Sequence, residues 1–439
     1  MTRKILLLLS LLLICSLARS QKLANTSITP WQFGRNAAVS LTFDDGSINQ
    51  FTVALPILNK LSLPATFFII TGQIPGSQYQ GKFIGRPVEQ IIAETSGTPT
   101  NKDNFFERAS AIGFLGYSGT LPYHTNAGTA YDEEAHSRAQ EAYKIIDDGY
   151  EKVRNGAFKP KSNDDDRSGV TWDQIRSYAA QGHEFASHTV THPRLAVLDE
   201  ANMLYELEKS KEEILKQLGP KHTFSAEGPY GTENERAMQY MYKIYPALRN
   251  RMPEPFLEEL NRSSKMNPGL SKKGYVQWQR GATTKTPLPL MKSWVDTVAA
   301  NHNNWLVLVF HGVDGIGYEA LPHALLHEYF QYIRQHENNL WIATFGDVTK
   351  YMRERMNANV KQNETKQKIT ITLTHTLDPT MYDVPLTLRS YVPAGWNKVK
   401  VKQGSQEENL VAQKDNQGPY VQYQALPNTL PIEITSIQD

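Results

Sequence analysis

Residues 38–46 read Ala-Val-Ser-Leu-Thr-Phe-Asp-Asp-Gly and predict a buried β-strand directly before a pair of carboxylates. The short run of apolar and β-branched residues is typical of a strand buried on both faces of a parallel sheet. In α/β folds the reactive groups stand where the parallel strands end. Asp44 and Asp45 are therefore candidates for chemistry, although a turn favours the same residue types for its own geometry.

Strand-like and helix-like segments alternate after this stretch. We expect further strands at residues 65–70, 183–187, 223–226, 275–278, 305–310 and 340–344. Helical patterns occur at residues 51–61, 172–181, 198–218, 234–242, 287–301, 322–336 and 346–356. Strands that alternate with helices in this way predict βαβ units. About seven such units favour an α/β fold that forms a distorted (β/α) barrel over residues 32–356.

Two regions depart from this alternation. Residues 74–170 separate the second expected strand from the third, and we interpret them as a large structured insertion, because structureless loops of this length are uncommon. Three consecutive aspartates within residues 161–167 are interpreted as a solvated loop. After a polar, linker-like segment at 357–366, residues 367–439 alternate short apolar strands with Pro, Gly and Asn, which predicts a C-terminal all-β, sandwich-like module.

The first twenty residues have the pattern of a secretory signal peptide. Arg3 and Lys4 precede an apolar core at residues 5–14, and cleavage would follow Ser20. We therefore expect an exported protein, which is periplasmic, secreted or held at the cell surface. A lipid anchor on Cys15 is the alternative, although a large residue precedes it where lipoprotein signals have a small one. No later segment is long and apolar enough to predict a transmembrane helix.

Composition excludes several classes of protein. The 439 residues carry 46 basic and 45 acidic side chains, so no overall positive charge indicates nucleic-acid binding. Apolar residues make up 40% of the chain, which excludes a mainly disordered protein. Cys15 is the single cysteine, so intramolecular disulfides and multi-cysteine metal sites are excluded. The sequence does not indicate an oligomeric state.

Histidines stand at the ends of two other expected strands. Residues 187–193 read Ser-His-Thr-Val-Thr-His-Pro, so His188 and His192 are four residues apart and could ligate one metal ion. This spacing also arises by chance, and its position after a strand is what favours a metal site here. His311 follows the fully apolar strand at 305–310; a lone histidine is more often structural, but its place at a strand end favours a function.

Together these motifs resemble the polysaccharide deacetylase (NodB-homology, carbohydrate esterase) family. The Asp-Asp motif, the His-x-x-x-His motif and the strand that ends in a histidine occur in the family's order. The Pro-Tyr-Gly segment at 229–231 and the segment at 341–345 are similar as well. The resemblance covers about residues 36–356. The insertion is a departure, because the family usually joins the first two motifs by a much shorter segment, and the C-terminal module lies outside the resemblance.

The resemblance implies a metal-dependent hydrolase that removes acetyl groups from an N-acetylated or O-acetylated polysaccharide or oligosaccharide. Asp45, His188 and His192 would hold a divalent metal, most often zinc. Asp44 would be the general base on a water molecule, and His311 would be the general acid for the leaving group. The expected partner is an acetylated glycan.

Supporting roles follow from the same resemblance. The backbone N–H of Tyr230 would stabilise the oxyanion, and Trp278 and Val309 would line the acetyl pocket, although Trp278 could equally belong to the core. The family usually has an arginine that pairs with the catalytic aspartate, at the position where this chain has Glu227. Because a second carboxylate would raise the pKa of the base, we favour Arg280 as the source of the missing positive charge. The alternatives are that Glu227 faces solvent or the substrate and helps to select the glycan, or that the loop turns away at Gly228.

Several alternatives stay open. The carboxylate that would tune His311 is not evident, and Asp296 and Asp314 are the candidates. An esterase that acts on O-acetyl groups and an amidase that acts on a non-sugar amide would use the same residues. A catalytically degenerate glycan-binding protein is the alternative of another class, and Glu227 is the residue that favours it.

Overall fold

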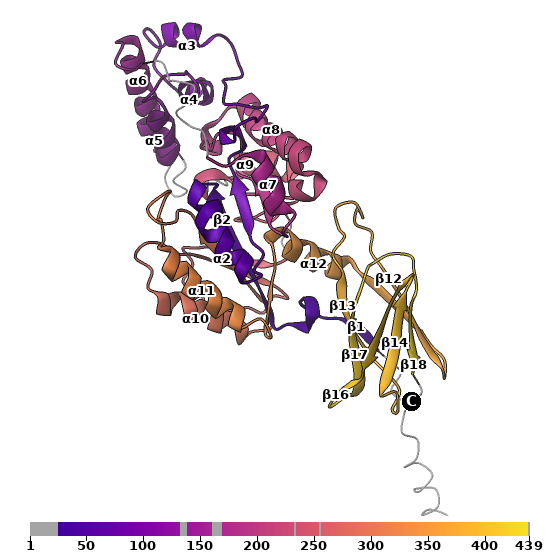
Figure 1. Cartoon of the computed structure of the whole chain (residues 1–439). Coiled ribbons are helices and arrows are strands. Elements are labelled where there is room, and N and C mark those ends of the chain that lie inside the picture. Colours follow the sequence, from indigo (N-terminus) through magenta and orange to yellow (C-terminus); the bar gives the residue numbers. More distant parts are fainter. Residues whose placement is uncertain (1–24, 132–137, 160–168, 232–233, 254–255, 438–439) are drawn as a thin grey trace, which may run out of the picture. The chain divides into compact units, whose positions relative to one another are not determined.

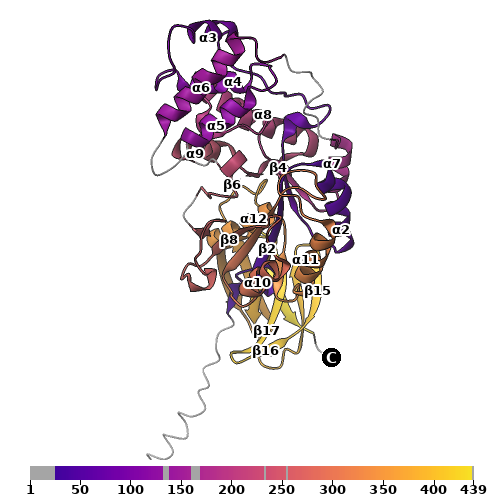
Figure 2. The same cartoon turned by 90° about the vertical axis from the view of Figure 1, so that its left-hand side faces the viewer.

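The computed structural model describes residues 25–131, 138–159, 169–231, 234–253 and 256–437. The described chain forms two compact units (Figures 1 and 2), of which the larger contains Arg35–Arg353 and Asp378–Asp383 and the smaller contains the rest. The expected signal peptide and the aspartate-rich loop lie outside the described residues. No helix in the described part of the chain has the length and apolar character needed to cross a membrane.

The larger unit is built on a nine-stranded sheet. Its strands are β2 (Ala37–Asp45), β3 (Thr66–Ile69), β4 (Glu184–Ser187), β5 (Ser225–Ala226), β6 (Ala247–Leu248), β7 (Glu258–Leu260), β8 (Val276–Gly281), β9 (Asn304–Phe310) and β10 (Leu340–Ile342). The hydrogen-bonded order is β6–β5–β4–β3–β2–β9–β8–β7, and β10 pairs with the start of β2. The pairings described in this sheet are all parallel.

The expected parallel α/β fold is confirmed, but the expected seven-stranded barrel is not. β6 and β7 are the two edges of the sheet and do not pair with each other among the described residues, so the sheet curls into an open half-barrel. These two strands are also the ones that the sequence did not predict. With two and three residues, they are too short to show the alternation by which a strand is recognised.

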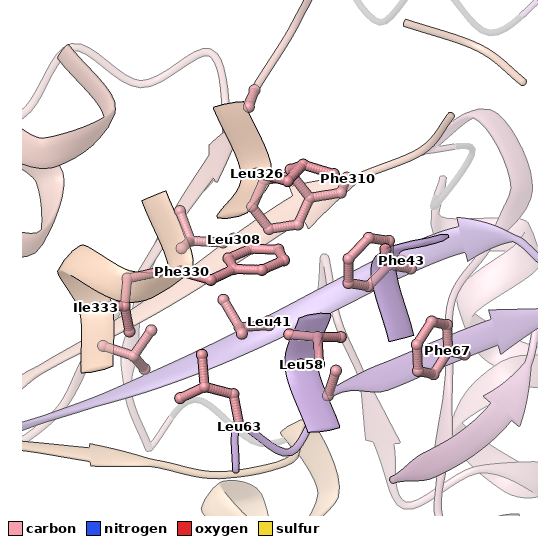
Figure 3. Packing of buried hydrophobic residues seen from close by; sticks show 14 of the residues in the cluster. Leu41, Phe43, Leu58, Leu63, Phe67, Leu308, Phe310, Leu326, Phe330 and Ile333 are labelled. Carbon is pink, nitrogen blue, oxygen red and sulfur yellow. The ribbon is translucent and has the colours of Figure 1, made fainter. Parts of the chain in front are cut away.

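A hydrophobic core lies between the sheet and the outer helices. These helices are α2 (Leu55–Lys60) with the preceding π-helical turn η2 (Gln50–Ala54), α7 (Trp172–Ala179), α10 (Leu288–Ala299) and α11 (His323–Gln335). Alternate residues of β2 and β9, among them Phe43 and Phe310, pack against Phe330 of α11 (Figure 3). Phe43 also stacks on Phe67 of β3, with ring centroids 5.1 Å apart. The intervening strand residues therefore face the concave side of the sheet.

The remaining helices of this sheet are α8 (Glu200–Leu218), α9 (Glu235–Ile244) and α12 (Phe345–Asn357). α8 contacts β4 and α9 contacts β6. At the start of α12, the ring of Phe345 packs on Trp305 of β9, with ring centroids 5.0 Å apart. Trp305 and Leu306 are adjacent in β9, so their side chains face opposite sides of the sheet. Leu306 belongs to the core between the sheet and the outer helices, so the first residue of α12 packs on the other, concave side.

The long connection between β3 and α7 folds into four helices with a core of their own. They are α3 (Val88–Glu94), α4 (Phe105–Gly113), α5 (Leu121–Tyr131) and α6 (Ala139–Arg154). Figure 1 shows them grouped together. His124 of α5 accepts a hydrogen bond from the N–H of Arg194 at 3.0 Å, and Ser110 of α4 accepts one from the N–H of Asp199 at 2.8 Å. The insertion therefore contacts the segment that follows the His-x-x-x-His motif.

The smaller unit contains two antiparallel sheets, so the expected all-β character is confirmed. One sheet has the order β1–β13–β17–β16 and the other β11–β12–β18–β14–β15. Their bounds are β1 (Thr26–Ile28), β11 (Asn359–Glu364), β12 (Lys368–Thr374), β13 (Leu386–Tyr391), β14 (Lys398–Gln403), β15 (Gln406–Val411), β16 (Gln413–Asp415), β17 (Gly418–Ala425) and β18 (Ile432–Ser436). Two parts of the chain were not expected in this unit. The segment at 357–366 contains strand β11 instead of a linker, and β1 joins the unit from the start of the described chain.

Three buried histidines of the larger unit each accept a backbone hydrogen bond through one ring nitrogen. They are His124, His183 and His222, and the donors are the N–H groups of Arg194, Ala65 and Phe185. Burial lowers the pKa of each to about 4. A protonated ring would lose the acceptor that the backbone N–H group needs, so these side chains are neutral in the folded protein.

We expect His183→Asn to weaken the acid sensitivity of this unit. The pKa of His183 in the folded chain, about 4, lies below its ordinary value of 6.5, so the unfolded chain takes up the proton first. The stability contributed by the neutral ring is complete above about pH 6.5 and is lost as the pH falls towards 4. Between pH 7 and 4.5, the wild type should lose on the order of 2 kcal/mol more unfolding free energy than the variant in urea titrations.

The comparison with the variant is needed because buried acids titrate in the same range with the opposite sign. Burial raises the pKa of Glu206 and of Glu259 to about 7, so acidification relieves their cost. These contributions are common to both proteins and cancel in the difference. Parallel stability curves for wild type and variant would contradict a neutral, buried His183.

Candidate active site

The candidate site lies where β2, β4 and β9 end. Asp44 and Asp45 are the last residues of β2, His188 follows β4 directly and His311 follows β9 directly. Because these strands are parallel, their carboxyl ends meet at one edge of the sheet. The structure thus brings together the residues that the sequence placed at separate strand ends, together with His192, which the His-x-x-x-His motif placed in the loop after β4.

Asp45, His188 and His192 form a group that could hold a metal ion. Oδ1 of Asp45 lies 3.6 Å from Nε2 of His188 and 3.3 Å from Nε2 of His192. Ligands at about 2.1 Å from a tetrahedral metal are separated by about 3.4 Å, so this spacing fits a zinc-like site. Nδ1 of His188 donates to the carbonyl of Glu227 at 2.9 Å, which directs the lone pair of Nε2 towards Asp45.

The protonation of His192 and Asp45 fits a metal site, whereas at His188 a metal ion would displace a proton: burial lowers the pKa of His188, but its hydrogen bond to Asp45 and the charges of Asp44 and Asp45 outweigh burial and raise it. Burial is the largest cause, and the charge of His188 the second, of a lowered pKa of about 3 at His192. Burial opposes the charged form of Asp45 too, but the hydrogen bond and the charge of His188 outweigh it and lower the pKa of this carboxyl. A neutral imidazole and an ionised carboxylate are the forms that bind a divalent cation.

The loop that carries the two histidines is held by a buried carboxylate that the sequence analysis missed. Glu206 of α8 accepts hydrogen bonds from the N–H of Val190 at 2.9 Å and from the N–H and hydroxyl of Thr191 at 2.8 Å. Thr189 and His192 both have positive φ angles, 68° and 65°, which are costly for residues with side chains. The three hydrogen bonds to Glu206 offset this cost. No sequence motif marks Glu206, which is one of several acidic residues on an amphipathic helix.

Asp44 lies in a different electrostatic setting from its neighbour. Its carboxylate is 3% exposed and accepts two hydrogen bonds from Arg249, each 2.7 Å long. Burial alone would raise the pKa of Asp44, but the charge and hydrogen bonds of Arg249 outweigh it and hold this pKa well below its usual range. Nε2 of His311 lies 3.5 Å from Oδ2 of Asp44. Asp44 is therefore an ionised carboxylate beside the possible metal ligands and outside their group.

Arg249 also pairs with Glu227, at 2.9 Å. Both side chains are buried, with exposed fractions of 0% and 2%. Burial raises the pKa of Glu227, and Asp44 adds to this, although the positive charge of Arg249 acts against it. The residue at the position of the family's arginine is thus a carboxylate that shares one cation with Asp44. We expected a cation between these two carboxylates, but the residue that fills this place is Arg249.

The expected role of Arg280 is wrong. Its guanidinium donates to the carbonyls of Arg262 and Ser264 and lies 4.5 Å from the ring of Trp278. Successive residues of a strand face opposite sides, and it is the adjacent Gln279 that reaches Arg249, donating to its carbonyl at 2.8 Å. Arg280 would have to stand one residue earlier or later in β8 to face the concave side.

The same alternation corrects one pocket residue. Trp278 belongs to the core on the helix side of the sheet, so it does not line the site. Val309 alternates with Leu308 and Phe310, which are in that core, and therefore faces the concave side, where it is paired in register with Thr42 of β2. Val309 is accordingly placed where a pocket residue would be.

Neither carboxylate expected to tune His311 is next to it. Asp296 accepts a hydrogen bond from the hydroxyl of Tyr332, and Asp314 bonds the ring and N–H of His323. Burial lowers the pKa of His311, and the charge of Asp44 only partly compensates. The carboxylate that lies next to His311 in the described structure is therefore that of Asp44.

Tyr230 lies on the metal side of the site. It has a positive φ of 62° within the short 3-10 turn η6 (Pro229–Gly231), and its ring centroid is 4.6 Å from that of His192. The guanidinium carbon of Arg194 lies 4.4 Å from the centroid of the Tyr230 ring. The ring is 44% exposed. Tyr230 thus lies next to the possible metal ligand His192, and the expected role of its backbone N–H stays a prediction.

The larger unit is a parallel half-barrel with a carboxylate and two histidines at its carboxyl edge, and these three side chains form a possible metal site. Residues 34–94 and 126–244 match the family model described as polysaccharide deacetylase. The matched residues lie in the larger unit, and the match confirms the resemblance to this family that the motifs indicated. The match leaves out residues 95–125 of the insertion, and it ends before Arg249.

Other similarities are more distant. Gellan lyase from a Bacillus species is 24% identical over 271 residues, which cover 58% of this chain and 11% of that protein, so the chain spans about a tenth of that relative. A family 4 carbohydrate esterase from Bacillus anthracis is 13% identical, with 74% of this chain and 86% of that chain covered and a TM-score of 0.34. For the chitin deacetylase from Colletotrichum lindemuthianum the values are 15%, 72%, 87% and 0.32.

We expect His188→Ala to lower the metal content of the purified protein, because it removes one of three donors that meet at one point. Elemental analysis after dialysis against zinc should give about one metal ion per wild-type chain and well under half for the variant. His323→Ala removes an exposed histidine on α11 and serves as the matched control. Unchanged metal content in His188→Ala would refute the donor set.

Arg249→Met should be destabilising and should change the titration of Asp44. Removing the cation leaves two buried carboxylates unpaired, which costs about 3–5 kcal/mol in urea unfolding. The pKa of Asp44 is then no longer held down, so this carboxylate becomes protonated at a higher pH; if Asp44 is the expected base, the acid limb of kcat/KM moves upward. Arg280→Met is the control and should leave that limb in place. An unshifted limb in Arg249→Met would contradict the pairing.

Proposed function

We propose that the larger unit is a metal-dependent deacetylase that hydrolyses the acetyl amide or acetyl ester of a glycan. The observation that carries this proposal is the position of Asp44. It is ionised, buried and outside the group of Asp45, His188 and His192, yet it is joined to that group along the chain and faces His311. A binding protein has no need for a charged, desolvated carboxylate at this point.

Asp45, His188 and His192 would hold a divalent cation, and zinc suits a site of one carboxylate and two imidazoles. When bound there, such a cation supplies Lewis-acid activation of a water molecule and of the acetyl carbonyl. Three protein ligands leave room for both, as catalytic zinc sites do. The spacing of the three donor atoms supports this assignment.

Asp44 is proposed as the general base. Arg249 holds both carboxylate oxygens and so fixes the orientation of the carboxyl group. The same cation would make Asp44 a weak base if it acted on Asp44 alone. Glu227 shares Arg249 from the other side, and its negative charge opposes the lowering of the pKa of Asp44. We therefore propose that Glu227 tunes the base.

His311 is proposed as the group that protonates the leaving amine or alcohol. Its lowered pKa means that the ring is neutral before the reaction at neutral pH. Asp44 would take a proton from water and pass it to Nε2 of His311, because Oδ2 of Asp44 lies 3.5 Å from that nitrogen. His311 would then give the proton to the leaving group. The backbone N–H of Tyr230 is proposed to stabilise the oxyanion, and Val309 to line the acetyl pocket.

An acetate-release screen tests the function. Chitin oligomers, peptidoglycan and acetylxylan are incubated with the zinc-loaded protein, and acetate is measured with and without a chelator. We expect release from at least one of these glycans, loss of release with chelator, and recovery when zinc is added back. Binding of a glycan without acetate release would favour the degenerate glycan-binding protein. Acetate released only from small amides would favour the amidase.

Two variants assign the roles within the same assay. Asp44→Asn should keep its metal and lose at least about a hundredfold in kcat, because an amide does not accept a proton. His311→Ala should also keep its metal, and it should harm acetyl amides more than an activated ester, whose leaving group needs little protonation. Equal losses on both substrates would contradict the acid role, and near-normal turnover in Asp44→Asn would contradict the base.

If the N-terminal pattern acts as a signal peptide, the substrate is met outside the cytoplasm. We propose export on the strength of that pattern alone. Extracellular and cell-wall glycans are polymers, which is consistent with a site at the open edge of a half-barrel.

A further inference from the structure

The loop after β9 places an exposed tyrosine next to His311. The ring centroid of Tyr318 lies 5.2 Å from that of His311, with the ring planes at 84°. Tyr318 is nevertheless 67% exposed, and His311 is its single aromatic partner among the described residues. Isolated exposed apolar residues are common on proteins, so exposure alone says little. The feature of Tyr318 that calls for a functional explanation is its position beside His311, the proposed general acid.

The backbone of this loop is closely held although it faces solvent. The N–H of Gly312 donates to the carbonyl of Tyr318 at 2.7 Å, and the N–H of Leu321 donates to the carbonyl of Gly312 at 3.0 Å. A Cβ atom on Gly312 would lie 2.4 Å from the carbonyl oxygen of Ile316. Gly317, with φ at +91°, packs against the same turn. Glycine is required at both positions to close the loop.

Two carboxylates fix the loop from its ends. Asp314 accepts hydrogen bonds from the N–H and from Nδ1 of His323, both at 2.8 Å. Glu319 accepts two from the N–H and hydroxyl of Thr284, both at 2.7 Å. Tyr318 is therefore presented to solvent by a preorganised loop. Such a side chain loses little conformational entropy when a ligand covers it.

A second exposed ring stands on the metal side. Tyr230 contacts His192 and is 44% exposed, whereas Tyr318 contacts His311. His192 and His311 are both close to the Asp44–Asp45 pair, at 3.3 Å from Asp45 and 3.5 Å from Asp44. Exposed aromatic faces thus border the proposed reaction site on the side of the metal ligands and on the side of the acid.

We propose that Tyr318 is a specificity-determining residue that stacks on a pyranose ring of the substrate. The C–H face of a pyranose is apolar and packs well on an aromatic ring through dispersion and weak C–H contacts. The substrate is then an oligomeric or polymeric glycan with a sugar ring across Tyr318 while the acetyl group reaches Asp44 and His311. This inference rests on the proposed deacetylase function. The rival role, in which Tyr318 only orients the His311 ring, is an outcome of the test.

The test compares Tyr318→Ala and Tyr318→Phe with the wild type in the zinc-loaded, full-length protein. The probes are N-acetylated chitotetraose, acetylated xylotetraose and p-nitrophenyl acetate, which has no sugar ring. Ile316→Ala is the matched control, because it removes an exposed apolar side chain from the same loop without removing a ring. Steady-state kcat and KM are measured for each probe.

We expect Tyr318→Ala to raise KM for the tetrasaccharide that is deacetylated by about five- to tenfold, with kcat within about twofold. Turnover of p-nitrophenyl acetate should be unchanged, and Tyr318→Phe and Ile316→Ala should resemble the wild type on all probes. An unchanged KM in Tyr318→Ala overturns the proposal. A fall in kcat on the tetrasaccharide and on the small ester alike, with a shifted pH profile, also overturns it and assigns Tyr318 to His311.

Failure of the proposed function gives a different result. If the wild type releases acetate from neither tetrasaccharide, the deacetylase function fails for these glycans, and stacking is read by affinity electrophoresis in gels that contain glycol chitin or acetylxylan. Retardation of the wild type that is lost in Tyr318→Ala supports the sugar-stacking role without any catalysis. Equal mobility of the two proteins in both gels overturns it.

Discussion

The bidentate pairing of Arg249 with Asp44, inside the curled sheet, is the interaction on which the rest of the site depends. A carboxylate that is 3% exposed and uncompensated would take up a proton or destabilise the fold. The sheet solves this with a guanidinium that is fully buried between two carboxylates, Asp44 and Glu227. Gln277 and Gln279 of β8 donate to the carbonyl of Arg249 and so hold its backbone in place. The charge balance of the site is thus shared by residues at the ends of strands β2, β5 and β6.

This arrangement gives two adjacent aspartates opposite electrostatic surroundings. Asp44 faces a permanent cation, and Asp45, with a φ of 76° at the end of the strand, faces two imidazoles that are only conditionally charged. One carboxylate is therefore held ionised by the protein itself, and the other is available to a metal. Pairs of titratable groups whose surroundings separate their roles are a feature of hydrolytic sites. In this chain the separation is achieved within a dipeptide.

Sequence reasoning could find what is tied to long apolar strands and could not find what is tied to short ones. Asp44, Asp45, His188 and His311 directly follow runs that read as buried strands, and parallel pairing alone brings such ends together. Arg249 follows a two-residue strand without a periodic signal, and nothing in the sequence marked it. Its partner Glu227 also follows a two-residue strand, and it was singled out only through the family resemblance. Arg280 was considered because it follows an expected strand, but a difference of one residue along a strand moves a side chain to the other face of the sheet. Likewise β1 joins the smaller unit through a pairing with β13 that no local pattern encodes.

The insertion, which is the largest departure from the family's usual chain, helps to hold the loop that carries His188 and His192. The N–H of Arg194, two residues after His192, donates to His124 of the insertion helix α5. From the other side Glu206 holds Val190 and Thr191, while the N–H of Gly72 donates to the carbonyl of Val190 at 2.8 Å. A loop with two positive-φ residues would otherwise relax, since each such residue costs on the order of 1–3 kcal/mol. The neutral ring of His124 can accept the bond from Arg194 only because burial keeps it unprotonated. The insertion therefore does more than add surface: one of its buried side chains contributes a contact that holds the chain two residues after His192.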